Sequence, residues 1–428
     1  MSTYIINGGN KISGTVTPMP NKNSILPLIC SAVLFDEPVT FHNVPKSTSV
    51  RVVTNIFKAL GGKVSYHRDG SLTLDGSTVD KYQIPDDLAE KERSSLMFLG
   101  GLLAKLGKAE LGKSGGCKLG SRPVDTLING LTELGAQIDP ENIYKLEAKE
   151  LKGNPKIWQF ETSVTGTENL IIAAVKAKGT TVIYNAACEP HVQDLCNFLN
   201  SIGAKISGIG SNKLTIEGVE KLTKGEWTVI SDHIDIGGLI VAAAITGGEL
   251  RIKNAIPSHM QQILEYYERV NLKVKIEGED IIVPANQKLI CQTRMKGDVE
   301  RIRAQPWPTG FPADLMPQML VLCMVAEGNM YLMNAMYENQ LYFVEDLQKM
   351  KGNVILSNPH VAFTYGPSPK LKGAVVSAPA VLQSAHAVAL AAFAARGETR
   401  ILNADIIKRR FPEFVEVMRS LGGDIREE

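Results

Sequence analysis

The residues most capable of chemistry lie in a glycine-rich loop around Cys117. Three cations, Lys113, Lys118 and Arg122, lie close to this cysteine along the chain. Positive charge stabilises a thiolate and an exposed thiolate is reactive, whereas a packed cysteine is inert. The glycines let the backbone turn sharply and let a ligand approach closely, and Pro123 then stiffens the chain. We therefore predict that Cys117 is a reactive thiol; the alternative is a buried cysteine beside an ordinary turn.

Two further candidates lie at the predicted starts of apolar helices. Lys22 and Asn23 precede the apolar stretch 25–34, where free backbone N–H groups and the helix dipole would add to the lysine charge in holding an anion. The alternative is a solvated lysine followed by an asparagine that caps the helix. Arg93 lies at the entry to the apolar stretch 94–106, and it either points at a phosphate or belongs to a charged surface.

Asp314 is the one carboxylate in a proline-rich segment, 306–318, that leads into another apolar helix. An aspartate at a helix start is most often an N-cap, but an aspartate that is partly desolvated in a cleft suits proton abstraction. Arg409 and Arg410 are adjacent near the end of the chain. Such a pair suits either bidentate phosphate binding or a solvated cluster.

The composition is that of an ordinary globular protein. The chain has 428 residues, of which 44% are apolar and 21% charged, with a formal net charge of +1. This length predicts two or three domains, and the near-neutral charge argues against a nucleic-acid-binding surface. No run of about 18 apolar residues is present, so no membrane span is expected. The six cysteines form no CxxC pair and predict no zinc site. Reduced cysteines and the lack of a signal-peptide pattern favour a cytoplasmic protein.

One supersecondary unit recurs along the chain. A β-type run and an asparagine turn are followed by an amphipathic helix and a closing turn of the Leu-Gly-Gly type. Five copies carry the asparagine, at Asn43, Asn185, Asn254, Asn334 and Asn403. In a sixth copy the Gly-Gly-Cys loop takes its place, and function is expected in this divergent copy. A fixed period of this kind indicates one unit multiplied six times.

Each copy also has an upstream helix that is apolar nearly all round and is therefore predicted to be buried. These helices are expected at residues 25–34, 94–106, 169–177, 236–245, 315–326 and 385–395. Six β-α-β-α-β-β units predict an α/β protein with helices inside and sheets outside, three units to a domain. A single row of six units is the alternative.

Together these motifs resemble the UDP-N-acetylglucosamine 1-carboxyvinyltransferases, a family of enolpyruvyl transferases similar to EPSP synthase, and the resemblance covers the whole chain. It rests on Lys22-Asn23, Gly115-Gly116-Cys117, Gly120-x-Arg122-Pro123-Val124-Asp125, Ser163 to Asn169, Glu189-Pro190, Asp232 and Phe311-Pro312-Ala313-Asp314. The resemblance implies transfer of the enolpyruvyl group of phosphoenolpyruvate to the 3-hydroxyl of UDP-N-acetylglucosamine, with release of phosphate. This would be the first committed step of peptidoglycan precursor synthesis, and it implies no cofactor and no metal.

The resemblance also implies residue roles. Cys117 would protonate the enol carbon, and Asp314 would accept the proton of the attacking hydroxyl. Lys22 and Asn23 complete the implied catalytic set. Substrate binding is implied for Arg93, Arg122, Pro123, Val124, Asp125, Ser163, Val164, Glu338, Gln340, Gln383 and Arg409.

The implied fold is a two-domain inside-out α/β barrel built from the six repeats. Domain I would comprise residues 1–21 and 231–428, and domain II would comprise residues 22–230, including the Cys117 loop. The active site would lie in the cleft between the domains, with that loop as a lid. The implied partners are the two small-molecule substrates, without nucleic acid or membrane, and the protein would be a monomer or a weak homo-oligomer.

The chain departs from the family pattern at two positions where the family has arginine. Gln340 and Gln383 stand there. Glutamine keeps hydrogen-bonding capacity but lacks the charge and the planar fork of arginine. Arg303 and Arg410 are the cations that could compensate. The alternatives are therefore a divergent paralogue with another nucleotide acceptor or another donor, and a catalytically silent homologue that binds a UDP-sugar.

Overall fold

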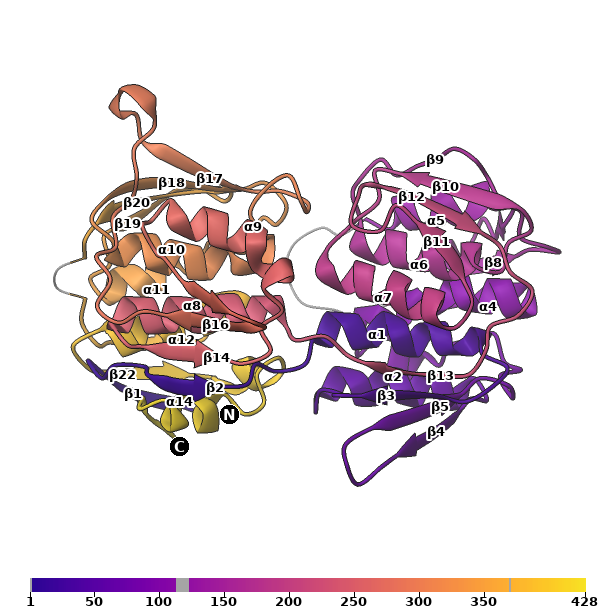
Figure 1. The fold of residues 1–428 in the computed structure, drawn as a ribbon, viewed down its shortest axis with the longest axis horizontal. Coiled ribbons are helices and arrows are strands. Elements are labelled where there is room, and N and C mark those ends of the chain that lie inside the picture. Colours follow the sequence, from indigo (N-terminus) through magenta and orange to yellow (C-terminus); the bar gives the residue numbers. More distant parts are fainter. Residues whose placement is uncertain (1, 113–122, 369–370) are drawn as a thin grey trace. The chain divides into compact units, whose positions relative to one another are not determined.

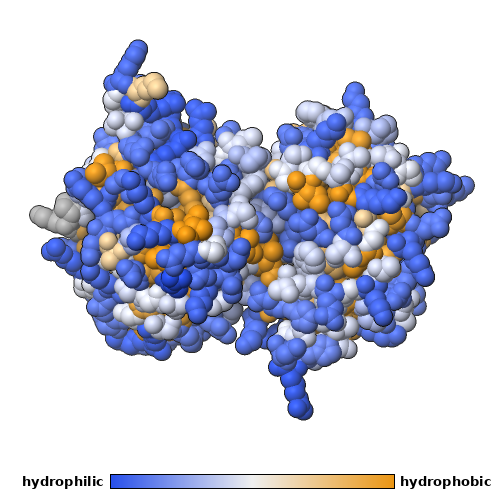
Figure 2. Space-filling view, viewed as in Figure 1, coloured by the Kyte–Doolittle hydropathy of each residue, from blue (hydrophilic) through white to orange (hydrophobic). Residues whose placement is uncertain are grey.

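The computed structural model describes residues 2–112, 123–368 and 371–428 (Figure 1). Among these residues, no helix combines the length and the apolar character that a membrane crossing requires. Hydrophilic side chains cover most of the face shown in Figure 2, with hydrophobic side chains scattered between them. This is the ordinary surface of a protein in contact with water.

The chain divides into two compact units. The first unit contains the described residues 2–19 and 231–428, and the second contains the described residues 20–112 and 123–230. Each unit has its own hydrophobic core.

The described part of the first unit contains three four-stranded sheets (Figure 1). The strands of the first sheet are, in spatial order, β21 (Val375–Ser377), β22 (Gly397–Leu402), β1 (Tyr4–Gly8) and β23 (Asp424–Glu427). Those of the second sheet are β15 (Lys275–Glu277), β16 (Asp280–Val283), β14 (Leu250–Ile252) and β2 (Gly14–Val16). Those of the third sheet are β17 (Glu300–Ala304), β18 (Gly328–Asn334), β20 (Val361–Gly366) and β19 (Val354–Asn358). Each sheet has one parallel pair at its edge, and its other pairs are antiparallel.

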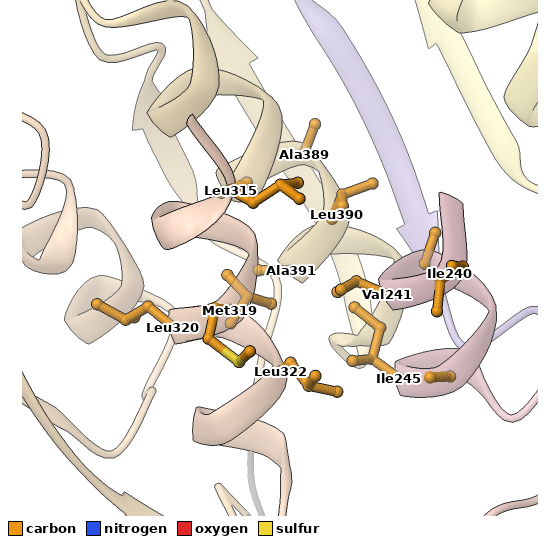
Figure 3. Packing of buried hydrophobic residues seen from close by; sticks show 14 of the residues in the cluster. Ile240, Val241, Ile245, Leu315, Met319, Leu320, Leu322, Ala389, Leu390 and Ala391 are labelled. Atoms are coloured by element: carbon orange, nitrogen blue, oxygen red, sulfur yellow. The ribbon is translucent and has the colours of Figure 1, made fainter. Parts of the chain in front are cut away.

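Three helices form the centre of the first unit. They are α8 (His233–Thr246), α10 (Met316–Val325) and α12 (Leu382–Ala394). Because these helices are apolar on nearly every side, they are stable only when other elements cover them. Figure 3 shows Ile240, Leu322 and Leu390, one from each helix, in the shared core. The shorter or amphipathic helices are α9 (Pro257–Glu268), α11 (Val344–Lys349), α13 (Asp405–Lys408) and α14 (Phe414–Ser420), with 3₁₀ turns at Met295–Gly297 and Ala313–Leu315.

The described part of the second unit has two four-stranded sheets and one three-stranded sheet. The strands of one four-stranded sheet are, in spatial order, β11 (Lys205–Ser207), β12 (Lys213–Glu217), β10 (Thr180–Tyr184) and β9 (Ile157–Trp158). Those of the other are β13 (Gly225–Thr228), β3 (Val39–His42), β5 (Leu72–Asp75) and β4 (Lys63–Tyr66). The three-stranded sheet consists of β6 (Lys108–Glu110), β8 (Lys145–Glu147) and β7 (Gln137–Ile138). The four-stranded sheets again have one parallel edge pair each. The three-stranded sheet has, in place of a parallel edge strand, a single parallel bridge between Gln83 and Glu110. This is the copy whose sequence carries the cysteine loop.

The second unit also has three buried helices, α1 (Lys22–Ser31), α4 (Phe98–Leu106) and α6 (Val164–Ala174). The remaining helices are α2 (Thr48–Ala59), α3 (Asp86–Ala89), α5 (Asp125–Glu133) and α7 (Pro190–Ser201), with 3₁₀ turns at Ala32–Leu34 and Arg93–Met97. The buried helices predicted from the six apolar stretches are therefore confirmed in both units. The main difference is at their starts: α6 begins at Val164 rather than at residue 169, because the Ser163 hydroxyl accepts the Gly166 N–H and caps the helix there.

The closing turns explain why the repeat keeps glycine and asparagine. All six turns hold one residue at positive φ: Gly61, Gly135, Gly203, Asn271, Lys351 and Gly422. Glycine adopts this conformation without strain, and asparagine does so more readily than most residues. The asparagine turns are left-handed at Asn43, Asn185, Asn254 and Asn403. Asn334 is the exception; it ends β18, is fully buried and takes part in a polar network described below.

The sheets in each unit are separate, and the described strands close no barrel. The fold is therefore a mixed α/β architecture in which buried helices are covered by small mixed sheets.

Candidate active site

Two residues that are central to the sequence-based prediction, Cys117 and Arg122, lie outside the part of the chain that the structure describes. Cys117 and Arg122 fall within residues 113–122, so their roles stay predictions. The five cysteines that the structure describes are all buried. Burial raises the pKa of the thiol in several of them, among them Cys30, Cys188 and Cys196. The exception is Cys291, whose pKa is lowered by its hydrogen bond with Cys323. Because a thiol packed in an apolar core is inert and all five are buried, Cys117 remains the candidate for thiol chemistry.

Lys22 and Asn23 are the first two residues of α1, as their order in the sequence predicts. The cap is Asn21, however, rather than Asn23. The Asn21 side chain accepts the backbone N–H groups of Asn23 and Ser24 at 2.9 and 3.1 Å. The alternative in which Asn23 caps the helix is thus wrong, and the Asn23 amide is available to a ligand. Both Lys22 and Asn23 are partly exposed at the positive end of the helix dipole.

The buried carboxylate of Asp194 is hydrogen-bonded to the first turn of α1. Asp194 on α7 accepts hydrogen bonds from the Ser24 hydroxyl and from the Trp227 indole N–H, the latter at 3.0 Å. Burial raises the pKa of Asp194 to about 6, against the lowering effect of these two donors. Sequence reasoning missed this residue, although a single aspartate on the apolar face of an amphipathic helix was a usable signal.

The other predicted residues of the second unit lie at element starts. Arg93 begins a 3₁₀ turn and is partly buried. Asp125 is the exposed first residue of α5, directly after Pro123 and Val124. Ser163 caps α6, and Val164 is its first residue. Each therefore lies at the start of a helix or 3₁₀ turn, where the first backbone N–H groups have no acceptor within the helix itself.

Glu168 is a buried acid within this unit that the sequence analysis did not single out. It lies on α6 with 1% of its surface exposed, and neither carboxyl oxygen has a hydrogen-bond partner among the described residues. Burial, with a further contribution from the negative charge of Glu189, raises its pKa well above the ordinary value. Burial therefore favours the neutral, protonated form of the Glu168 carboxyl group.

Asp314 in the first unit does not cap a helix. It is the middle residue of the 3₁₀ turn that leads into α10, the N-cap of the turn is Pro312, and the N-cap of α10 is Leu315. Within the described residues its carboxylate has no hydrogen-bond or ion-pair partner. The interpretation of Asp314 as a capping residue is thus wrong. A partly buried, unpaired carboxylate at a helix start can accept a proton from a bound hydroxyl group.

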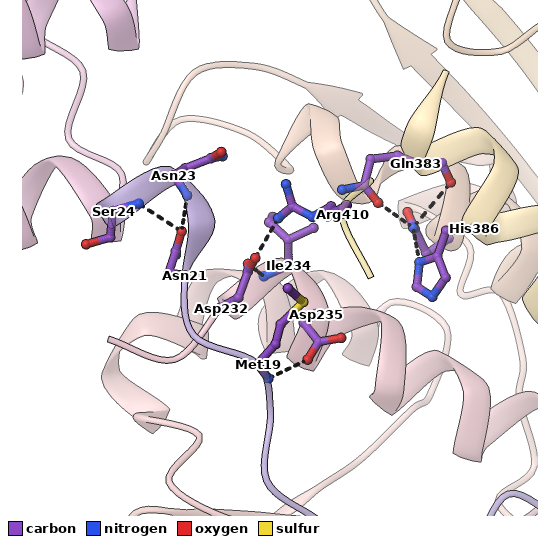
Figure 4. A network of polar contacts seen from close by, with 11 residues as sticks. Met19, Asn21, Asn23, Ser24, Asp232, Ile234, Asp235, Gln383, His386 and Arg410 are labelled. Carbon is purple, nitrogen blue, oxygen red and sulfur yellow. Dashed lines mark hydrogen bonds and ion pairs between the residues drawn. The ribbon is translucent and has the colours of Figure 1, made fainter. Parts of the chain in front are cut away.

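A buried ion pair lies at the start of α8 (Figure 4). Arg410 donates from Nη2 to Asp232 Oδ2 at 2.7 Å, and the other oxygen of Asp232 caps α8 by accepting the Ile234 N–H. Asp235, one turn into the helix, accepts the Met19 N–H at 2.9 Å. Burial raises the pKa of Asp235 to about 7, and the negative charge of Asp232 adds to that effect, whereas the Met19 N–H and the Arg410 charge oppose it.

Gln383 and Gln340 are both buried and both hydrogen-bonded through their carbonyl oxygens. The Gln318 amide donates to Gln383 Oε1 at 2.9 Å and contacts His386 Nδ1 at 3.1 Å. The Asn334 amide donates to Gln340 Oε1. Burial, assisted by the charge of Arg410, lowers the pKa of His386 to about 3, so this imidazole is neutral.

The remaining predicted residues of the first unit are on the surface. Glu338, Arg409 and the candidate compensating cation Arg303 are exposed. The adjacent arginines therefore differ sharply, since Arg410 is buried and paired while Arg409 faces solvent. No group of three side chains suited to hold a metal ion occurs in the part of the chain that the structure describes.

These features agree with the comparisons to known proteins. The sequence model of EPSP synthase (3-phosphoshikimate 1-carboxyvinyltransferase) matches residues 6–418. The chain therefore belongs to this family of enolpyruvyl transferases.

Curated relatives that match the whole chain carry the name of one enzyme of this kind. A UDP-N-acetylglucosamine 1-carboxyvinyltransferase from Treponema denticola is 40% identical over 99% of this chain and 98% of its own. An enzyme with the same name from Borrelia garinii is 39% identical over 100% of this chain and 99% of its own.

Among solved structures, the enolpyruvyl transferase NikO from Streptomyces tendae has a TM-score of 0.85 at 24% identity, covering 100% of this chain and 98% of that one. An EPSP synthase from Acinetobacter baumannii has a TM-score of 0.76 at 17% identity, covering 100% and 99%. At these identities the likeness concerns the fold.

Proposed function

We propose that the protein is a UDP-N-acetylglucosamine 1-carboxyvinyltransferase that transfers the enolpyruvyl group of phosphoenolpyruvate to the 3-hydroxyl of UDP-N-acetylglucosamine and releases phosphate. The observation that carries this proposal is the full-length identity of 37–40% to curated enzymes of that name. Their product is a precursor of peptidoglycan. Because both substrates are metabolites of the cytoplasm, we propose that the enzyme works there.

In the proposed reaction, the sugar hydroxyl oxygen attacks C2 of phosphoenolpyruvate while C3 gains a proton, which gives a tetrahedral intermediate. Loss of a proton from C3 and of phosphate from C2 then restores the double bond. We assign proton donation at C3 to Cys117 and acceptance of the hydroxyl proton to Asp314. The unpaired carboxylate of Asp314 supports its role, because no described partner competes for the incoming proton.

We assign the anionic groups of the substrates to cations and helix starts. Lys22, Arg93, Arg122 and Arg409 would hold phosphate and carboxylate, and Asn23 would steady the intermediate. What supports Lys22 and Asn23 is their place in the first turn of α1, with the cap already supplied by Asn21. A pre-positioned helix start needs no reorganisation when charge develops. Pro123, Val124, Asp125, Ser163 and Val164 would contact the nucleotide, and Glu338, Gln340 and Gln383 would contribute to the substrate subsites of the first unit.

We also infer that the chain is built from six repeats in two domains with helices inside and sheets outside, residues 1–21 and 231–428 forming one domain and residues 22–230 the other. The recurring sheet pattern, with its parallel edge pair, and the six closing turns at positive φ support a repeated unit.

The test is release of phosphate from phosphoenolpyruvate in the presence of UDP-N-acetylglucosamine, with the product identified by a mass gain of one enolpyruvyl group. The same assay with 3-phosphoshikimate as acceptor distinguishes the two enzyme activities named among the matches. We expect release with the nucleotide sugar alone. Cys117→Ala should abolish it, whereas Cys291→Ala, which removes a buried thiol of the first unit, should not. No release with the nucleotide sugar from the folded wild-type protein would contradict the proposal.

A further inference from the structure

The segment that leads to Asp314 depends on other elements to hold it in place. It contains Pro306, Pro308 and Pro312, and a proline has no backbone N–H group that could donate a hydrogen bond. Such a segment can form fewer main-chain bonds than an ordinary loop of the same length. Contacts from side chains of neighbouring elements therefore matter more for its position, and for the position of the Asp314 carboxylate.

Helix α9 makes a directed contact with this segment. The Gln262 side chain donates from Nε2 to the backbone oxygen of Gly310, which lies four residues before Asp314. Because a carbonyl oxygen only accepts, the amide must turn its NH₂ group toward Gly310. A hydrogen bond weakens steeply when its direction changes, so it holds the main chain more strictly than apolar packing does.

Aromatic contacts from the same helix hold the next residue. Phe311 is fully buried, and its ring centroid lies 5.4 Å from that of Tyr266 and 6.1 Å from that of Tyr267. The Phe311 N–H also donates to the backbone oxygen of Arg303, on β17, at 3.0 Å. The amide contact of α9 and its aromatic contacts thus act on two consecutive residues, Gly310 and Phe311.

Helix α9 is in turn fixed against α8. The Tyr267 hydroxyl donates to the Gly237 oxygen of α8 at 3.0 Å. A Cβ atom on Gly237 would lie 2.6 Å from the Leu315 side chain and 3.1 Å from the Tyr267 hydroxyl oxygen, so the glycine allows both to approach. Leu315 packs in the shared core (Figure 3). The support on which Gln262 is mounted is therefore rigid.

A second contact from α8 holds the beginning of the segment. The Trp307 ring lies 6.0 Å from the ring of His233, the first residue of α8, in an edge-to-face arrangement. The segment is thus contacted by α8 near its beginning and by α9 near its end.

The chain between Gly310 and Asp314 transmits a displacement. Pro312 fixes φ at −58°, and the Leu315 N–H donates to the Pro312 oxygen at 3.0 Å. The residues on either side of Asp314 are Ala313, 8% exposed, and Leu315, 0% exposed. A stiff and packed connection of this length cannot absorb a shift of Gly310, so the shift reaches Asp314.

We infer that Gln262 is a positioning residue of the reaction: its amide fixes Gly310 and, through the stiff connection that follows, the carboxylate of Asp314. This inference rests on the proposed function, in which Asp314 accepts the proton of the attacking hydroxyl. A general base must lie within hydrogen-bond reach of the proton that it accepts, and a misplacement of about 1 Å can cost about 100-fold in rate.

The decisive variant is Gln262→Met, which keeps the length of the side chain and removes the NH₂ group. We expect kcat to fall about 10- to 100-fold, with the KM values for both substrates within about 2-fold of wild type. Gln261→Met, at the exposed neighbouring position on α9, is the matched control and should leave kcat unchanged. An unchanged kcat in Gln262→Met, or higher KM values at constant kcat, would overturn the inference.

A double variant tests whether Gln262 acts through Asp314. If it does, Gln262→Met combined with Asp314→Asn should have the same kcat as Asp314→Asn alone, because the carboxylate that Gln262 positions is already absent. A kcat lowered by the product of the two separate effects would show that Gln262 acts independently of Asp314, and would overturn the inference.

Amide hydrogen exchange separates this inference from the proposed function, because it needs no turnover. In Gln262→Met the N–H groups of Phe311 and Leu315 should exchange faster than in wild type, and in Gln261→Met they should not. Equal exchange in all three proteins removes the inference and leaves the function standing. A wild type without turnover contradicts the function, and faster exchange in Gln262→Met then still supports Gln262 as the residue that fixes the Asp314 segment.

Discussion

Arg410 and Asp232 are separated by 178 positions in the sequence, yet they form an ion pair of 2.7 Å in the core of the first unit, with 4% and 0% of their side chains exposed. Removing one partner of such a pair leaves a buried charge without compensation. We expect Arg410→Met to lower the free energy of unfolding by about 3–5 kcal/mol, measured by chemical denaturation.

Arg251 provides the control for this prediction, because it pairs with Glu277 and Asp280 at the surface. Arg251→Met should change stability little, since solvent screens such pairs. Similar losses in the two variants would show that the buried pair has no special weight.

The pH dependence of stability should carry the signature of Asp235, which faces Asp232, Arg410 and the Met19 N–H. The pKa of Asp235 is raised from 3.8 to about 7. The folded protein thus binds a proton that the unfolded chain has already released, so the contribution of Asp235 to stability falls as the pH rises from about 4 to about 7. The buried imidazoles of His233 and His386, whose pKa values are lowered to about 3, contribute with the opposite sign. Asp235→Asn keeps an acceptor for Met19 and should remove this contribution of Asp235, so that stability falls less, or rises more, with pH than in the wild type.

The measurement is the thermal stability of the wild type and of Asp235→Asn as the pH rises from about 4 to about 7. The exposed Asp298→Asn serves as the control and should follow wild type. Asp194, with a pKa of about 6, gives the second unit a dependence of the same sign that neither change removes. A variant whose profile matches wild type would show that Asp235 ionises as freely in the folded state as in the unfolded one.

The sequence predicted the buried helices well because their signal is local. A stretch such as residues 236–245 is apolar on every side, so only a core can hold it. The asparagine and glycine turns are local signals as well, and Asn43 and Gly61 have the positive φ that suits their residue types.

The polar interior could not be predicted in the same way, because its pairs are distant along the chain. Arg409 and Arg410 look equivalent in the sequence, and only the fold distinguishes the exposed one from the buried one. The contact between Ser24 and Asp194 spans 170 positions. The pattern Lys22-Asn23 correctly indicated the start of a helix, but it did not reveal that the preceding residue, Asn21, is the cap.

Asn21 should matter for activity through the geometry of α1. Asn21→Ala removes the acceptor for two backbone N–H groups and should cost about 1 kcal/mol of stability. It should also raise the KM for phosphoenolpyruvate, because Lys22 and Asn23 would lose their fixed position. Asn21→Asp keeps the cap and should retain both properties, which steady-state kinetics and thermal denaturation can measure. Kinetics unchanged in Asn21→Ala would argue against a role for the start of α1 in binding.

Asp314 should influence turnover without supporting the fold. Its carboxylate has no partner within the described residues, so Asp314→Asn removes no stabilising contact and should leave the melting temperature unchanged. If the carboxylate accepts the proton of the attacking hydroxyl, the same change should lower kcat about 10²- to 10⁴-fold while both KM values stay close to wild type. The contrast with Asn21→Ala is diagnostic, because a positioning defect moves KM and stability together. Retention of full kcat in a folded Asp314→Asn protein would exclude this residue as the base and would move the search to other carboxylates of the first unit.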